Sequence, residues 1–150
     1  MAFSSLDDVL AFAIEREEEA AALYRSVAAE ARTESLRLLL GDLEAEERAH
    51  KALLEKFRAG AAVPSAGSKV LDLKLTDALA ADSADPAGSA QDVLILAARK
   101  EARAAELYAR LAASASTDEM RSLFDYLAGQ ELRHKFRLEN EYEAHVLKED

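Results

Sequence analysis

Cysteine is absent from this chain of 150 residues. Its absence excludes disulfides, thiolate zinc sites, iron–sulfur clusters and a rubredoxin-type iron site. Any metal ion must therefore be held by carboxylate and imidazole side chains. Proline and glycine are scarce, with 2 and 5 residues, and most of them fall in residues 60–67 and 82–88. Because these two residues are the main helix breakers, long helices are possible on either side of the two stretches.

Long apolar runs are also missing, since no segment approaches the roughly 20 residues that span a membrane. The first residues, MAFSSLDDVL, lack the basic start and apolar core of a secretory signal. The formal net charge of −10 would repel nucleic acid and anionic membrane surfaces. We therefore expect a cytoplasmic protein with neither nucleic acid nor membrane among its partners.

Hydrophobic periodicity predicts four long helices, at about 6–31, 34–58, 90–114 and 118–147. The expected N-caps are Ser4 or Ser5, Thr33, Ser89 and Thr117. Short connections predict two antiparallel hairpins, at about 5–59 and 89–147, joined by a crossover at about 60–88 in which residues 71–81 could form a short helix. The expected fold is a single all-α domain, an antiparallel four-helix bundle.

An internal repeat supports this arrangement, because the sequence aligns with itself without insertion when it is shifted by 84 positions. Glu17 then falls on Glu101, Tyr24 on Tyr108, Glu47 on Glu131 and His50 on His134. The chain therefore reads as two copies of one helical hairpin, for which we expect a pseudo-two-fold axis.

Ionisable residues interrupt the apolar stripe of each predicted helix. The first stripe contains one glutamate followed by Ala20, and the third contains one glutamate followed by Ala104. The second and fourth stripes contain Glu-x-x-His. The set is Glu17, Glu47, His50, Glu101, Glu131 and His134. Burial of a lone carboxylate lowers the stability of the fold by several kcal/mol unless the carboxylate takes up a proton, and four carboxylates together repel one another. Two divalent cations would formally cancel four carboxylates, so the pattern predicts two metal ions.

The spacing agrees with this prediction, because Glu-x-x-His puts both side chains on one helix face. One glutamate from each of two helices, with Glu-x-x-His from the other two, is typical of di-iron carboxylate bundles. The alternative is a different helix phase, with these residues at the surface, but the repetition of the whole pattern argues against it. Tyr24 and Tyr108 follow Glu17 and Glu101 on the same stripes. Each could hydrogen-bond a liganding carboxylate or simply fill the core.

Four motifs summarise the pattern: Glu17-x6-Tyr24, Glu47-x-x-His50, Glu101-x6-Tyr108 and Glu131-x-x-His134. Through these motifs, nearly the whole chain resembles the rubrerythrin branch of the ferritin-like superfamily. The resemblance implies a non-haem di-iron site with bridging carboxylates that reacts with peroxide or dioxygen. Electrons would come from an external donor. The resemblance is also the reason for preferring iron, because the ligand types alone suit Fe, Mn and Zn.

Two departures leave the activity open. The chain has no cysteine for a rubredoxin domain, and Ala104 stands where rubrerythrins carry a further glutamate. The remaining six ligands are similar to a bacterioferritin-type ferroxidase centre. The alternatives are therefore a protein that handles or stores iron, and a module in which metal only stabilises the fold. A homodimer is also expected, because two-helix repeats leave long exposed helix faces.

Overall fold

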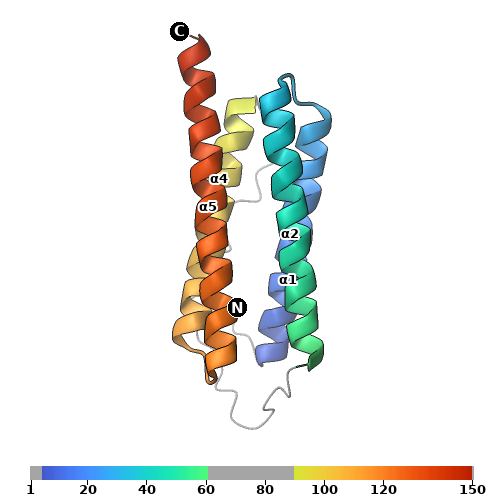
Figure 1. The fold of residues 1–150 in the computed structure, drawn as a ribbon, viewed down its shortest axis with the longest axis vertical. Coiled ribbons are helices and arrows are strands. Elements are labelled where there is room, and N and C mark those ends of the chain that lie inside the picture. The colour runs from blue at the N-terminus through green and yellow to red at the C-terminus, as the bar shows by residue number, and fades with distance from the viewer. Residues whose placement is uncertain (1–4, 61–89, 150) are drawn as a thin grey trace. The chain divides into compact units, whose positions relative to one another are not determined.

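The computed structural model describes residues 5–60 and 90–149, which form four helices (Figure 1). They are α1 (Leu6–Ala29), α2 (Glu34–Gly60), α4 (Ala90–Ala113) and α5 (Asp118–Glu149). Within these ranges there is no strand. The chain divides into two compact units, Met1–Asp72 and Leu73–Asp150. Helices α1 and α2 pack together as hairpin one, and α4 and α5 pack together as hairpin two. The predicted all-α, four-helix class is confirmed, whereas Ser89, most of the crossover and its possible short helix lie outside the described residues.

Three of the predicted caps have the expected geometry. The side-chain oxygens of Ser5, Thr33 and Thr117 accept hydrogen bonds from the backbone N–H groups of Asp8, Leu36 and Met120, at 3.1, 3.2 and 3.1 Å. Each bond satisfies one of the backbone donors that the first turn of a helix leaves without an intrahelical acceptor. These short polar residues therefore set where α1, α2 and α5 begin.

Hairpin one is antiparallel, as the contact between its two ends shows. Arg58, near the end of α2, donates two hydrogen bonds to Asp7 in the first turn of α1, with Nε–Oδ1 at 2.7 Å and Nη2–Oδ2 at 3.0 Å. The largest fully buried side chains of the two helices are Leu10, Tyr24, Leu40, Leu43 and Leu54. Burial of these side chains is the main force that holds the two amphipathic helices together.

Hairpin two has a core of the same kind, with Leu94, Leu107, Tyr108, Phe124, Leu127 and Leu138 fully buried. The rings of Tyr108 on α4 and Phe124 on α5 stack with centroids 6.2 Å apart and planes at 14°. Such offset aromatic pairs add to the free energy gained by burial. No helix in the described ranges is both long and apolar enough to cross a membrane.

One detail of the predicted stripes is wrong. Ala20 and Ala104 were expected in the core but are only partly buried, whereas Ala21 and Ala105 are buried. An α-helix completes one turn every 3.6 residues, so the residues three and four positions after the glutamate are both candidates for the core. The packing of the helix decides between them. The structure takes the step of four in both helices.

Candidate metal centre

The six ionisable residues predicted at the core lie there, although nothing in their chemistry favours burial. Their exposed fractions are between 1% and 3%, for Glu17, Glu47, His50, Glu101, Glu131 and His134. Charged residues are almost never fully buried unless they are paired or bind a metal ion. The alternative helix phase, which would place these residues at the surface, is therefore wrong.

In hairpin one, α1 supplies Glu17 and α2 supplies Glu47 and His50. One possible ligand atom from each of the three lies within 4.8 Å of the others. Nδ1 of His50 is 3.4 Å from Oε1 of Glu47 and 3.7 Å from Oε2 of Glu17. The two α2 residues meet because they are three positions apart on one helix face. Glu17 reaches them across the helix pair.

Hairpin two repeats this arrangement with Glu101 from α4 and Glu131 and His134 from α5. One ligand atom from each again lies within 4.8 Å of the others. Nδ1 of His134 is 3.6 Å from Oε2 of Glu101. Within the described part of the chain, the buried groups able to hold a metal ion contain only the six predicted residues, three from each hairpin.

The distances between these atoms fit a bound ion. Imidazole nitrogens and carboxylate oxygens bind transition metals at about 2.0–2.2 Å, so two ligands of one ion are about 3.0–3.7 Å apart. The three separations given above, 3.4, 3.6 and 3.7 Å, fall in or at the edge of this range. They are longer than the roughly 2.7–3.2 Å of a good N–H···O hydrogen bond. The donor set and its spacing therefore suit a metal ion better than they suit a direct hydrogen bond.

The electrostatics of hairpin one point the same way. Burial raises the pKa of the Glu17 carboxyl to about 8; the nearby His50 imidazole opposes this rise, and the charge of Glu47 adds to it. Burial lowers the pKa of the His50 imidazole, but the nearby carboxylates of Glu17 and Glu47 raise it to about 9. Both shifts mean that this cluster attracts positive charge. Protons supply that charge when no metal is bound, and a divalent cation would replace them.

An apolar frame surrounds each cluster, and it is the same in both hairpins. One turn before and after Glu17 lie Ala13 and Ala21, and Leu43 and Leu54 flank the Glu-x-x-His pair of α2. The counterparts in hairpin two are Ala97, Ala105, Leu127 and Leu138. All eight side chains are buried, with at most 4% exposed. Each cluster is therefore bordered along its helices by buried apolar side chains.

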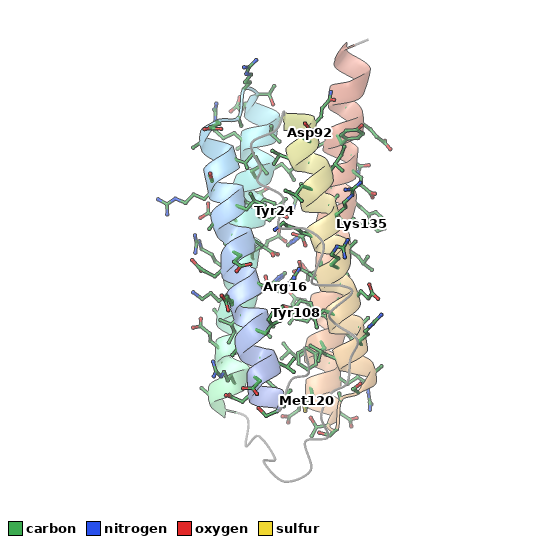
Figure 2. The ribbon with its side chains drawn as sticks, turned by 180° about the vertical axis from the view of Figure 1, so that it is seen from behind. Arg16, Tyr24, Asp92, Tyr108, Met120 and Lys135 are labelled. Carbon is green, nitrogen blue, oxygen red and sulfur yellow. The ribbon has the colours of Figure 1, made fainter. Side chains whose placement is uncertain are left out.

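Tyr24 and Tyr108, labelled in Figure 2, are buried on α1 and α4 as predicted. Tyr108 stacks on Phe124, so it contributes to the core of hairpin two. A hydrogen bond from either phenol to a liganding carboxylate stays a prediction.

Comparison with known proteins gives a fold but no function. A solved structure, described as a hypothetical protein from Pyrococcus furiosus, is similar to the chain with a TM-score of 0.70 and 28% sequence identity. The likeness covers 93% of this chain and 89% of that one. No family model matches the chain, and no curated protein matches it. The resemblance to rubrerythrins therefore rests on the motif residues themselves.

Proposed function

We propose that the chain is a non-haem di-iron protein, similar to the rubrerythrins, that reduces peroxide or dioxygen with electrons from an external donor. The observation that carries the proposal is the duplicated cluster: each hairpin buries two glutamates and one histidine with their ligand atoms turned toward one another. One such cluster could be an isolated polar defect in a core. Two of them, on equivalent residues of a repeated sequence, favour a centre that holds two ions.

The charges support one divalent cation for each hairpin. Two carboxylates and a neutral imidazole carry a charge of −2, which one such ion formally cancels. Without a counter-charge, burial of the same groups costs several kcal/mol, or protons must be taken up. We infer that the two ions form one dinuclear centre with shared carboxylates, as the resemblance implies. Iron is preferred on the same ground, and manganese or zinc would suit the same ligands.

The side chains of the protein would have defined roles around such a centre. Glu17 and Glu101 supply carboxylate oxygens from α1 and α4, while the Glu-x-x-His pairs of α2 and α5 supply an oxygen and a nitrogen each. The buried leucines and alanines exclude water and so strengthen the electrostatic interactions inside. Two ferrous ions, when bound, supply the two electrons that convert hydrogen peroxide and two protons into two water molecules.

The test is anaerobic loading with Fe(II) followed by rapid mixing with hydrogen peroxide or with dioxygen. If the proposal is correct, iron bound to the protein is oxidised faster than the same iron in buffer. With the preferred oxidant, the rate for bound iron exceeds the rate in buffer by at least about tenfold. A variant with both Glu17→Gln and Glu101→Gln should lose this acceleration. Rates equal to those of free iron in the unmodified protein would contradict the proposal.

A second candidate is a ferroxidase that handles or stores iron. Ala104 favours it, because an alanine offers no additional ligand one turn after Glu101, and this alanine is only partly buried. Storage requires a hollow shell, so the mass of the particle in solution separates the two functions. A 24-subunit particle would favour storage, and a dimer would argue against it. If metal only stabilised the fold, the double glutamine variant would change the melting temperature while the unmodified protein showed no redox reaction.

A further inference from the structure

The outer faces of the two hairpins differ at equivalent positions. In hairpin one, a cluster of charges connects α1 and α2. Arg48 donates hydrogen bonds to Glu44 at 3.0 Å and to Glu18 at 3.2 Å, and Lys51 donates to Glu18 at 3.0 Å. These side chains are partly exposed, with 23% to 44% of their area accessible. This face is therefore polar and holds its own charges together.

In hairpin two the same face keeps one of these charges, Lys135 at the position of Lys51, and the other three are replaced by apolar residues. The residues 84 positions after Glu18, Glu44 and Arg48 are Ala102, Ala128 and Leu132. Leu132 is 41% exposed, and Phe136, one turn further along α5, is 54% exposed. Large apolar side chains with this exposure gain free energy if another surface covers them. The loss of the bridging charges and the gain of exposed leucine and phenylalanine thus occur together.

These apolar residues lie on a continuous face of α5 that also carries charges. Steps of three or four residues connect Arg121, Asp125, Ala128, Leu132, Lys135, Phe136 and Glu139, which we call the α5 face. Figure 2 labels Lys135 of this set. Its charged members are all at least partly exposed. The order along the helix is basic, acidic and apolar up to Leu132, then basic at Lys135, apolar at Phe136 and acidic at Glu139.

We propose that the α5 face is the interface through which two copies of this chain form an antiparallel, two-fold symmetric dimer centred near Gln130. The charge order carries the proposal. An antiparallel copy centred there places Arg121 opposite Glu139 of the second copy and Asp125 opposite its Lys135. Ala128 then lies opposite Leu132 of the second copy.

The two-fold axis produces every pair twice, so four complementary ion pairs flank two pairs of Leu132 with Ala128. An isologous contact of this kind is the commonest way in which identical chains associate. Lys135 and Glu139 are already 3.9 Å apart on one helix, and Arg121 lies 3.2 Å from Asp118. These exposed pairs within one helix contribute little, so they can rearrange at an interface. Hairpin one has Arg48 at the position of Leu132 and would oppose such a contact.

The first test places like charges opposite each other, in the variant with Ala128→Lys and Leu132→Lys. Sedimentation equilibrium of the full chain, with and without chelator, should show a dimer for the unmodified protein and at least a tenfold higher dissociation constant for this variant. The control is Leu38→Lys with Leu53→Lys, two exposed leucines of α2. Circular dichroism checks that the variants remain helical. A monomeric unmodified chain, or an equal effect of both variants, would overturn the proposal.

The second test concerns the pairing of charges. Asp125→Lys alone should raise the dissociation constant several-fold because it faces Lys135 of the second copy. Adding Lys135→Asp should restore the affinity to within about twofold, since the pair is then only exchanged. Failure of this restoration would overturn the proposed register, and with it the proposal.

The absence of cysteine allows a third test by single substitutions. Gly129 has nothing within 4 Å of an added Cβ, so Gly129→Cys fits the helix. In the proposed dimer, this residue lies about 3 Å along the helix axis from the same residue of the second copy, at a rise of about 1.5 Å per residue. Ser122→Cys would lie about 24 Å from its copy by the same measure. A short thiol-reactive cross-linker should therefore join copies at Gly129 and not at Ser122; the reverse result would contradict the proposed centre.

Discussion

Hairpin one and hairpin two differ least where their side chains are buried and most where they are exposed. Around the clusters of Glu17 and Glu101, the apolar frame has alanine and leucine at the same positions, and all of these side chains are buried. On the outer face, the ion cluster of Arg48 in one hairpin is replaced by the exposed Leu132 in the other. The buried clusters are therefore alike in the two hairpins, while the exposed faces differ.

The largest effect should come from removing metal. If each hairpin binds one ion, an excess of free metal of 100 times the dissociation constant stabilises the fold by about 2.7 kcal/mol per site, or about 5 kcal/mol in total. Urea unfolding with and without a chelator measures this difference. Glu17→Ala and Glu101→Ala should each leave about half of it, and a strong inequality between these two variants would show that the clusters are not equivalent.

The next effect concerns the cores. Leu43→Ala and Leu127→Ala each remove a fully buried leucine beside a cluster. Each should lower the free energy of unfolding of the metal-free protein by about 2–5 kcal/mol, because a cavity remains where the side chain was. Chemical denaturation of the two variants gives the comparison directly. Losses that differ by more than about 2 kcal/mol would show that the two frames are packed differently.

The metal-free protein should also lose stability as pH rises from about 4.5 to about 9. The pKa of Glu17 is raised from 4.5 to about 8, so its burial costs stability increasingly above pH 4.5. The pKa of His50 is raised from 6.5 to about 9, so its contribution is complete below pH 6.5 and is lost by about pH 9. Thermal unfolding with a chelator across this range measures the slope.

In that experiment Glu17→Gln is the matched variant, and it should flatten the slope because it removes one of the two proton-binding groups. Metal affinity should change in the opposite direction, since binding displaces these protons and is therefore stronger at higher pH. A metal-free protein that gains stability between pH 5 and pH 9 would contradict the assigned charges.

The smallest effect is expected at the outer face of hairpin one. Arg48→Leu introduces the residue found at the equivalent position of hairpin two. It removes contacts to Glu18 and Glu44 that are partly exposed, so the loss in stability should be below about 1 kcal/mol and should shrink in high salt. A salt titration of the melting temperature measures this. A loss as large as that of Leu43→Ala would mean that the charges hold α1 and α2 together.

From the sequence alone, three helix starts and the burial of the six ionisable residues could be predicted. The caps Ser5, Thr33 and Thr117 are local signals, because each side chain bonds to the backbone three residues later. The burial of Glu17 and His134 followed from their place in apolar stripes, and the repeat removed the ambiguity of each stripe taken singly. These predictions succeeded because periodicity and capping are local properties of a single helix, and because the repeat is visible in the sequence itself.

What could not be predicted depends on contacts between helices. The burial of Ala21 rather than Ala20 depends on which side chains pack against α1, and a single stripe does not contain this information. That Nδ1 of His50 faces both Glu17 and Glu47 is likewise a property of the packed pair. The ion cluster of Arg48 joins residues about 30 positions apart, so its charges look like an ordinary polar surface in the sequence.

Anomalous scattering from crystals, measured on both sides of the iron and zinc absorption edges, tests the central claim most directly. We expect two peaks per chain, one against Glu17, Glu47 and His50 and one against Glu101, Glu131 and His134. Iron should be the metal in protein loaded with Fe(II) without air. Peaks confined to surface carboxylates, or no peak at either cluster in loaded crystals, would contradict the account.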